Sequence, residues 1–182
     1  MRYWIASSSF RVLATMSFLL VASAICWAGE KAHREAGAHE HGNGRASIAV
    51  EGNKLLFELE MPAADVVGFE HDASTAAQKT AVADAKKLLG QPTAIIALPA
   101  AANCRVRKSS SEFEKHGGEH AEFHAAYELE CGNIAALATM EFKHFKVFPR
   151  AKKLNVAVIG SRAQKSFDVT PEQPTILFKG LF

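Results

Sequence analysis

Residues 47–61, SIAVEGNKLLFELEM, decide the fold of this chain. Apolar and polar residues alternate on both sides of Gly52-Asn53, and a period of two is typical of β-strands with one buried face. Gly-Asn suits a two-residue turn, so Ser47–Glu51 and Lys54–Met61 are predicted to form a β-hairpin. Pro62 cannot donate to a sheet ladder and should end the second strand.

A helix is predicted further along the chain, over Thr75–Leu89. Thr75 and Gln78 have the spacing of a capping box, and Ala and Leu recur along one face of the segment. Gly90 and Pro92 favour an end after Leu89. The apolar segment Thr93–Leu98 (TAIIAL) then predicts a buried strand.

The first residues have the layout of a secretory signal peptide. Arg2 and Arg11 supply a basic start, Val12–Ile25 is a short apolar run, and Ala28 is a small residue before a polar stretch. The apolar run is short for a membrane span, so we expect cleavage after Ala28. An uncleaved membrane anchor is the alternative. Bulky Ile25 before Cys26 argues against a lipoprotein. The protein is therefore expected in the periplasm.

The exported part of the chain is close to neutral. Loss of residues 1–28 removes two of the 21 Lys and Arg, which leaves 19 against 19 Asp and Glu. The sequence has no basic stripe that would indicate a nucleic-acid partner. It also has no second apolar run that would indicate a membrane span after cleavage. All eight histidines lie in this part.

Two cysteines remain after cleavage, and they predict a second hairpin. In an oxidising compartment Cys104 and Cys131 should form a disulfide. If the two strands are antiparallel with these residues opposite each other, Val106 meets Leu129 on the apolar side. The same register pairs opposite charges on the outer side, Arg105 with Glu130 and Arg107 with Glu128. Residues 111–122 would then form the hairpin tip.

The remaining segments complete an α+β prediction: a mostly antiparallel sheet with the 75–89 helix packed on it and a His-rich hairpin loop. Ile134–Phe142 is expected to be a strand, and Phe142, Phe145 and Phe148 indicate a short helix before Pro149. Leu154–Ile159 and Ser166–Val169 resemble a terminal hairpin. The predicted organisation is a signal peptide (1–28), a histidine-containing arm (29–45) and one further domain (46–182).

Histidine is concentrated at three places. His39 and His41 stand two residues apart, so both imidazoles point the same way on an extended segment. His71 follows Phe69-Glu70 ahead of the predicted helix. The hairpin tip, EFEKHGGEHAEFH (112–124), combines three histidines with four glutamates. Zinc binds imidazole nitrogen and carboxylate oxygen, so we predict two clusters, one of His39, His41 and His71 and a looser one of His116, His120 and His124.

These histidines and their metal also have alternative interpretations. Gly117-Gly118 disfavours a helix at the tip, which predicts a flexible loop that orders around metal. His144 lies among aromatic residues and is predicted to have a structural role. His33 in the arm is no better a candidate for a metal ligand. Nickel and copper(II) also accept imidazole, although several imidazoles with glutamate make Zn²⁺ the default.

Enzymatic activity is not expected. His39-Glu40-His41 lacks the spacing of the HExxH zinc proteases, in which the histidines stand four apart on a helix. The sequence contains no GxSxG elbow, no phosphate-binding loop and no cysteine left free for a nucleophile.

The segment HEHGNGRASIAVEGNKLLFELEMPAADVVGFEHDASTAAQKTAV (39–82) resembles the opening of the ZrgA-type family of exported proteins. The matching features are His-x-His-Gly at 39–42, Pro62, and Val-Gly-Phe-Glu-His at 67–71. Further features are Ala-x-Cys at 102–104, the His-rich insertion, Cys131 and Phe-Pro at 148–149. The resemblance covers nearly all of the exported chain, and its Gly-Phe-Glu-His segment is the most specific part.

The resemblance implies a zinc-regulated periplasmic zinc-binding protein that assists a zinc-uptake ABC transporter. The expected function is reversible zinc binding, as a reservoir or as a hand-off partner of a solute-binding protein. The insertion here is shorter than is usual in the family, which argues against high capacity. An envelope interaction module with incidental histidines and a copper or nickel buffer remain the alternatives.

Overall fold

The computed structural model describes residues 41–116 and 120–182. The predicted signal peptide (1–28), His33, His39 and Glu119 lie outside these residues. Nine strands are present in the described ranges: β1 (Asn43–Glu51), β2 (Lys54–Pro62), β3 (Ile96–Ala97), β4 (Cys104–His116), β5 (His120–Cys131), β6 (Thr139–Phe142), β7 (Lys153–Ile159), β8 (Gln164–Val169) and β9 (Thr175–Leu177). The helices are α1 (Ala63–Val66), α2 (Ala76–Leu89), α3 (Pro92–Ile95) and α4 (His144–Val147), with 3₁₀ turns at η1 (Ala100–Ala102) and η2 (Ile134–Ala136).

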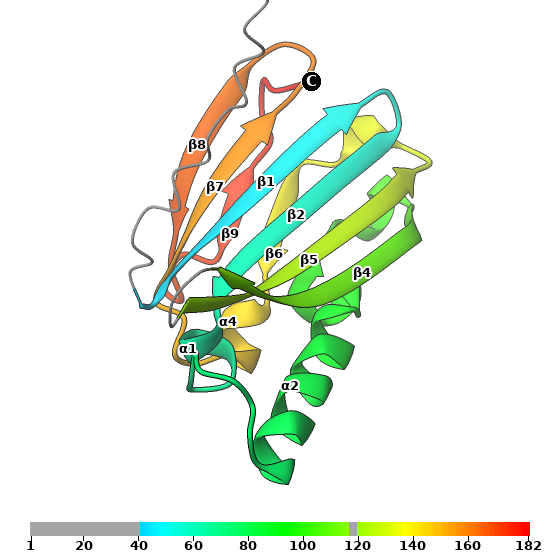
Figure 1. Cartoon of the computed structure of the whole chain (residues 1–182). Coiled ribbons are helices and arrows are strands. Elements are labelled where there is room, and N and C mark those ends of the chain that lie inside the picture. Colours follow the sequence, from blue (N-terminus) through cyan, green and yellow to red (C-terminus); the bar gives the residue numbers. More distant parts are fainter. Residues whose placement is uncertain (1–40, 117–119) are drawn as a thin grey trace, which may run out of the picture. The chain divides into compact units, whose positions relative to one another are not determined.

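The strands form two sheets (Figure 1). The larger sheet has the order β4-β5-β2-β1-β7-β8, and the smaller has the order β3-β6-β9. Every pairing is antiparallel except that of β1 with β7, which is parallel. The predicted α+β fold with a mostly antiparallel sheet and one main helix is therefore confirmed. None of the helices in the described ranges is long and apolar enough to cross a membrane.

The hairpin expected from the 47–61 segment is present as β1 and β2. Ile48 lies opposite Phe57, and Glu51 lies opposite Lys54 across the Gly52-Asn53 turn. Burial alternates along both strands. The sequence period of two therefore corresponds to one buried and one exposed face.

The main helix begins where the capping box predicts. The Thr75 hydroxyl accepts from the Gln78 backbone N–H, and the Gln78 side chain accepts in turn from the Thr75 N–H. Tyr127 Oη on β5 donates to the Leu89 carbonyl at 2.5 Å, which ties the last turn of α2 to the sheet. The strand predicted for TAIIAL is wrong in its first half, because Pro92 starts the short helix α3 there.

The disulfide hairpin has the predicted register at its base. Cys104 pairs with Cys131 and forms a disulfide with it, and Val106 lies opposite Leu129. A β-bulge after Val106 then shifts the ladder by one residue, so the predicted Arg107–Glu128 pair is wrong. In its place Lys108 lies opposite Glu128, and Arg107 pairs with Glu130 at 2.6 Å. Val106 is 42% exposed, because β4 is an edge strand.

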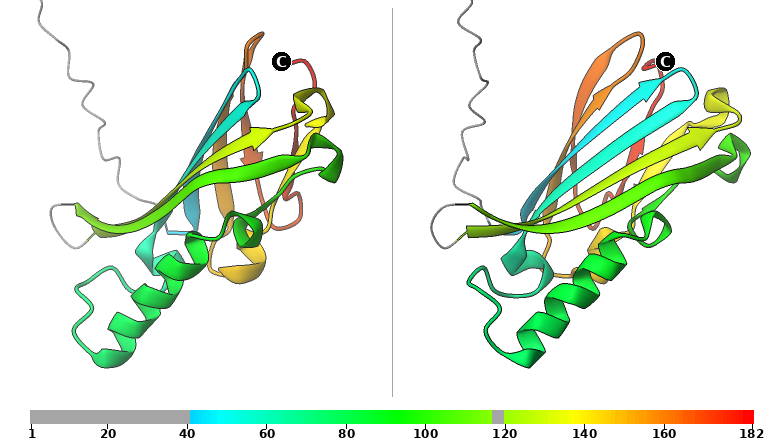
Figure 2. Two further views of the ribbon diagram at one scale, coloured as in Figure 1. Left: turned by 90° about the vertical axis from the view of Figure 1, so that its right-hand side faces the viewer. Right: turned by 45° about the vertical axis from the view of Figure 1, so that its right-hand side comes forward.

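The hairpin is longer than predicted. Residues 111–116 and 120–122 belong to the strands, although a flexible tip was expected there. Figure 2 shows the β4–β5 hairpin extending past the other strands, at the end of the sheet where α1 lies. This extension decides which histidines meet, because it places His116 opposite His120 and leaves His124 four residues, roughly 13 Å, further along β5.

The inner face of the large sheet carries the aromatic core. The Phe57 ring stacks on Tyr127 at 5.2 Å between centroids and contacts Phe142 of the small sheet at 6.3 Å. The predicted short helix and terminal hairpin are present as α4 and as β7 with β8. The segment 134–142 is a 3₁₀ turn followed by β6, and is a strand only in its second half.

Candidate metal centre

The start of β1 is fixed through the backbone of Gly42. Its N–H lies 2.8 Å from each carboxylate oxygen of Asp65, and its carbonyl accepts from the N–H groups of Lys152 and Lys153. Gly42 has a φ of +86°, a conformation that side chains other than glycine rarely adopt. The glycine of the His-x-His-Gly motif therefore holds the backbone beside His41 in one orientation.

The loop after α1 brings a carboxylate to the same place. Gly68 has a φ of +89°, and the Arg150 guanidinium lies 3.0 Å from the position that a Cβ atom would occupy. A residue other than glycine would be strained in this backbone conformation, and the Arg150 side chain would have to move to admit it. Gly68 thus permits the turn that directs Phe69 and Glu70 back towards the sheet.

Glu70 joins two histidines from distant parts of the sequence. One carboxylate oxygen, Oε1, lies 3.2 Å from His41 Nε2, and the other, Oε2, lies 3.1 Å from His120 Nδ1. The Glu70 side chain is only 11% exposed, whereas the His41 and His120 side chains are 65% and 53% exposed. Among the described residues, Oε1 is buried without a hydrogen bond of good geometry. A buried carboxylate therefore faces two accessible imidazoles.

Asp65 adds a second buried carboxylate behind this group. Its side chain is 3% exposed, and burial raises its pKa, while the Gly42 N–H and the His41 imidazole act in the opposite direction. Glu70 also contributes to the rise, because two nearby carboxylates repel. A cation in this position would be favoured by both carboxylates.

His124, the third histidine predicted for the tip, lies four residues from His120 along β5. His124 lies on the outer face of β5, opposite Glu60 of β2 and Glu112 of β4. Its Nε2 is 3.4 Å from Glu122 Oε2 and 3.8 Å from Glu114 Oε2. The hydrogen bond with Glu122 is the main reason that the pKa of His124 is raised, against the effect of burial. His120 is directed to Glu70, so it joins His41 and not His124.

Three other predicted ligands remain: His71 on an exposed loop, His116 opposite His120, and His39 outside the described residues. The His71 ring is exposed, stacks on Phe69 at 5.0 Å and places Nδ1 2.9 Å from the Asp72 carbonyl. Next to it, Lys115 pairs with Asp72 at 2.7 Å, which ties this loop to the hairpin. His116 pairs with His120 in the β4–β5 ladder. His39 lies two residues before His41 and outside the described ranges.

Among residues 41–116 and 120–182, no group of three or more His, Cys, Asp or Glu side chains is arranged so that it could hold a metal ion. The contacts of Glu70 nevertheless have the spacing of zinc ligands. Ligands at 2.0–2.1 Å from a tetrahedral zinc ion are roughly 3.3 Å apart, close to the 3.1 and 3.2 Å found here.

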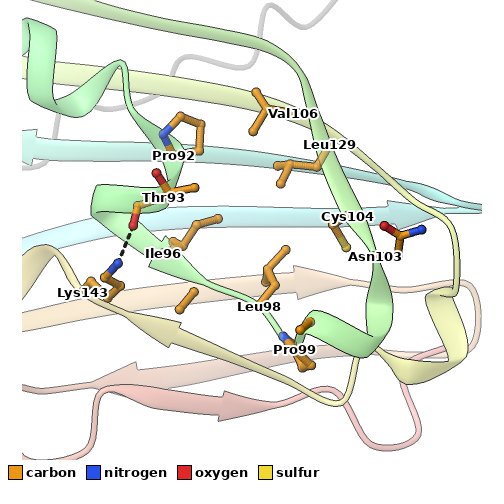
Figure 3. Close-up of a pocket in the computed structure, with 12 residues that line it drawn as sticks. Pro92, Thr93, Ile96, Leu98, Pro99, Asn103, Cys104, Val106, Leu129 and Lys143 are labelled. Atoms are coloured by element: carbon orange, nitrogen blue, oxygen red, sulfur yellow. Dashed lines mark hydrogen bonds between the residues drawn. The ribbon is translucent and has the colours of Figure 1, made fainter.

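The hollow between β3 and β4 is a different kind of surface (Figure 3). Its lining contains no imidazole or carboxylate side chain, and Cys104 is part of the disulfide. Lys143, at its edge, donates to the Thr93 carbonyl at 2.5 Å. The ligand chemistry of zinc is therefore at the α1 end of the sheet and not in this hollow.

The comparison with known families agrees with this chemistry. The model of the ZrgA family, described as zinc uptake proteins, matches residues 38–178. The chain belongs to the ZrgA family. A comparison with curated proteins gave no match. The family description gives the protein a role related to zinc, and both His41 and Glu70 lie within the matched residues.

Part of this candidate centre could be predicted from the sequence of this ZrgA-family chain. His41 and His120 were predicted as ligands, although in different clusters, because the loop length assigned to the tip was too great. Glu70 is part of the Gly-Phe-Glu-His segment, but its neighbour His71 was the residue predicted as a ligand. The signal that could have identified Glu70 is Gly68 two residues earlier, since a turn there directs the next carboxylate inward. Asp65 carried no such signal.

Proposed function

We propose that this protein is an exported, periplasmic zinc-binding protein that captures zinc reversibly at His41, Glu70 and His120. It would serve zinc acquisition or storage by handing the ion to the solute-binding protein of an ABC-type uptake system. The observation that carries the proposal is the nearly buried Glu70 carboxylate between two exposed imidazoles. Membership of a zinc uptake family supports the cargo, and the disulfide supports an oxidising compartment.

The centre is suited to exchange. Two imidazoles and one carboxylate give zinc three protein ligands and leave a fourth position open. His39, two residues before His41, is the proposed fourth ligand from this chain. A ligand from a partner protein could replace it without dismantling the other three, which is what a hand-off requires. The role is binding and transfer, and no catalytic step is proposed.

The remaining histidines take secondary places in this proposal. His124, with glutamates on both neighbouring strands, would be a weaker site for incoming cations. His116 stays a predicted ligand of the hairpin. His71 is exposed and directed at its own loop, so it serves as the matched control for histidine substitutions.

Zinc calorimetry on the exported chain, residues 29–182, tests the site. Glu70→Gln keeps the size of the side chain but removes its charge, and His120→Ala removes one imidazole. Each should weaken zinc binding at least about 10-fold, because each removes one of three or four ligands. His71→Ala and His124→Ala should change affinity far less than His120→Ala. Equal losses in all four variants, or no loss in the first two, would refute the assignment.

Metal identity and transfer are tested separately. Competition between zinc, nickel and copper(II) in the same titration distinguishes zinc uptake from buffering of the other two metals. Stopped-flow transfer of zinc to a purified zinc-specific solute-binding protein should be faster than release to a chelator at matched affinity. Transfer no faster than release would leave storage as the role.

A further inference from the structure

A large cavity lies at the other end of β1 from His41. It has a volume of about 840 Å³ and is bounded by the β1–β2 turn at Gly52, by η2 and by the C-terminal residues. In Figure 1 the β1–β2 turn and the C-terminus lie together at the end of the sheet remote from α1. The β1 strand has nine residues, so the cavity and the metal centre are about 30 Å apart.

Specific backbone contacts build the wall of this cavity. The Leu181 carbonyl accepts from the Arg162 N–H at 3.0 Å, and the Ala138 carbonyl accepts from the Phe178 N–H at 2.9 Å. Leu181 and Phe178 are both buried. A Cβ atom on Gly160 would overlap the Leu181 carbonyl, so this glycine is required for the close approach of the C-terminal segment.

The lining is apolar with a basic rim. Ile134, Leu177 and Phe182 contribute apolar surface, and Leu177 is 60% exposed. The charged side chains of the lining are Arg162 and Lys179, which are both cations and both exposed. Within residues 41–116 and 120–182, neither takes part in an ion pair. An exposed apolar patch with a polar rim is typical of an interaction or ligand-binding site.

From this lining we infer that the cavity binds an anionic amphiphile, with its apolar chain in the cavity and its anionic group between Arg162 and Lys179. The volume is within the range of small-molecule sites, about 300–1,000 Å³. Arginine forms bidentate hydrogen bonds with carboxylates, and lysine adds a point charge. The occupant is a free long-chain carboxylate, because one apolar chain fits this half-open apolar volume and its single anionic group fits the two cations.

The test uses cis-parinaric acid, a fluorescent long-chain carboxylate, with the exported chain and with variants of it. Saturable micromolar binding is expected, with weaker binding of the uncharged parinaric methyl ester. The double variant Arg162→Gln/Lys179→Gln should lose at least about 10-fold in affinity for the acid and little for the ester. Leu177→Asp should weaken both. Arg105→Gln, an exposed change on β4, is the matched control and should change neither.

Zinc calorimetry on the same variants shows that the fold is intact, and unchanged zinc affinity is expected because the two sites are far apart. A second variant, Gly160→Ala, displaces the C-terminal wall and should reduce binding of acid and ester alike. The proposal is overturned by an absence of saturable binding, by equal binding of acid to the wild type and the double variant, or by binding to anionic vesicles alone.

Discussion

Two regions of this molecule use histidine in opposite ways. At the α1 end of the sheet, His41, His120 and His124 are partly exposed and each lies within 4.0 Å of a carboxylate oxygen. Behind the sheet, His144 is fully buried, contacts the rings of Phe142 and Phe145, and has no hydrogen-bond partner for either ring nitrogen in the described part of the chain. The pKa shifts follow these surroundings.

The pKa of His124 is raised, mainly by its hydrogen bond with Glu122, whereas burial lowers the pKa of His144 to about 4. The first environment favours a positive charge on or near the imidazole, and the second excludes it. A divalent cation, like a proton, is favoured in the first environment and disfavoured in the second. The number of histidines is therefore a poor guide to a metal site, and the carboxylates around each histidine are a better one.

The largest expected effect concerns His144. In the unfolded chain it should gain its proton near pH 6.5, but in the folded protein only near pH 4. Unfolding is thus favoured as the pH falls between these values, by about 3 kcal/mol at pH 4. Urea unfolding of wild type and His144→Leu between pH 7 and 4 measures this difference, since the carboxylate contributions are common to both.

The variant should lose less stability on acidification than the wild type, with the gap opening below pH 6.5. His71→Ala, at an exposed histidine, should follow the wild-type curve. Parallel curves for wild type and His144→Leu would contradict the contrast between the two regions.

A smaller loss is expected at Gly42. Substitution by alanine forces a side chain into a φ of +86° and brings the new Cβ to 3.1 Å from the Lys152 side chain. The cost should be about 1–2 kcal/mol in the free energy of unfolding, with weaker zinc binding because Gly42 directly follows His41. The Gly52→Ala variant is the control. Gly52 also has a positive φ but open space around it and no place in the metal centre, so it should lose stability without losing zinc affinity.

Asp65 should act on zinc through position. In Asp65→Ala the Gly42 N–H loses its acceptor, and zinc affinity should fall several-fold, by about 1 kcal/mol. Asp65→Asn keeps one acceptor oxygen and should recover part of the loss. Hydrogen exchange of the Gly42 amide, measured by NMR, should become faster in the alanine variant. Unchanged exchange together with weaker zinc binding would mean that Asp65 acts by charge alone.

The smallest effect is a shift in one titration. NMR of the His124 ring protons should give a pKa above the ordinary histidine value, and Glu122→Gln should lower it. Because the folded-state pKa is raised, the stability that His124 provides is present at low pH and is lost as the pH rises through that pKa. A His124 pKa that does not respond to Glu122→Gln would show that the neighbouring strands, and not Glu122, set it.

The sequence predicted the elements whose signals are local. The β1–β2 turn, the Thr75 capping box and the pairing of Cys104 with Cys131 depend on residues close together or on one register. The α+β class followed from them. The bulge after Val106 was not predictable, because nothing in the local pattern distinguishes it from a regular ladder.

The candidate metal centre was only half predictable for a related reason. The imidazoles were visible, but the contact of His120 with Glu70 joins residues 50 positions apart in the sequence. This contact depends on the length of the hairpin. Because β4 and β5 extend to His116 and His120, His120 faces the loop that carries Glu70. Ligand types can be seen in a sequence, whereas their convergence depends on the tertiary structure.

Anomalous diffraction at the zinc edge, from crystals of the exported chain grown with zinc, tests the central claim most directly. The account predicts one strong peak at about 2.0–2.2 Å from His41 Nε2, a Glu70 oxygen and His120 Nδ1. A principal peak at His124 and its glutamates, or at His71, would contradict it.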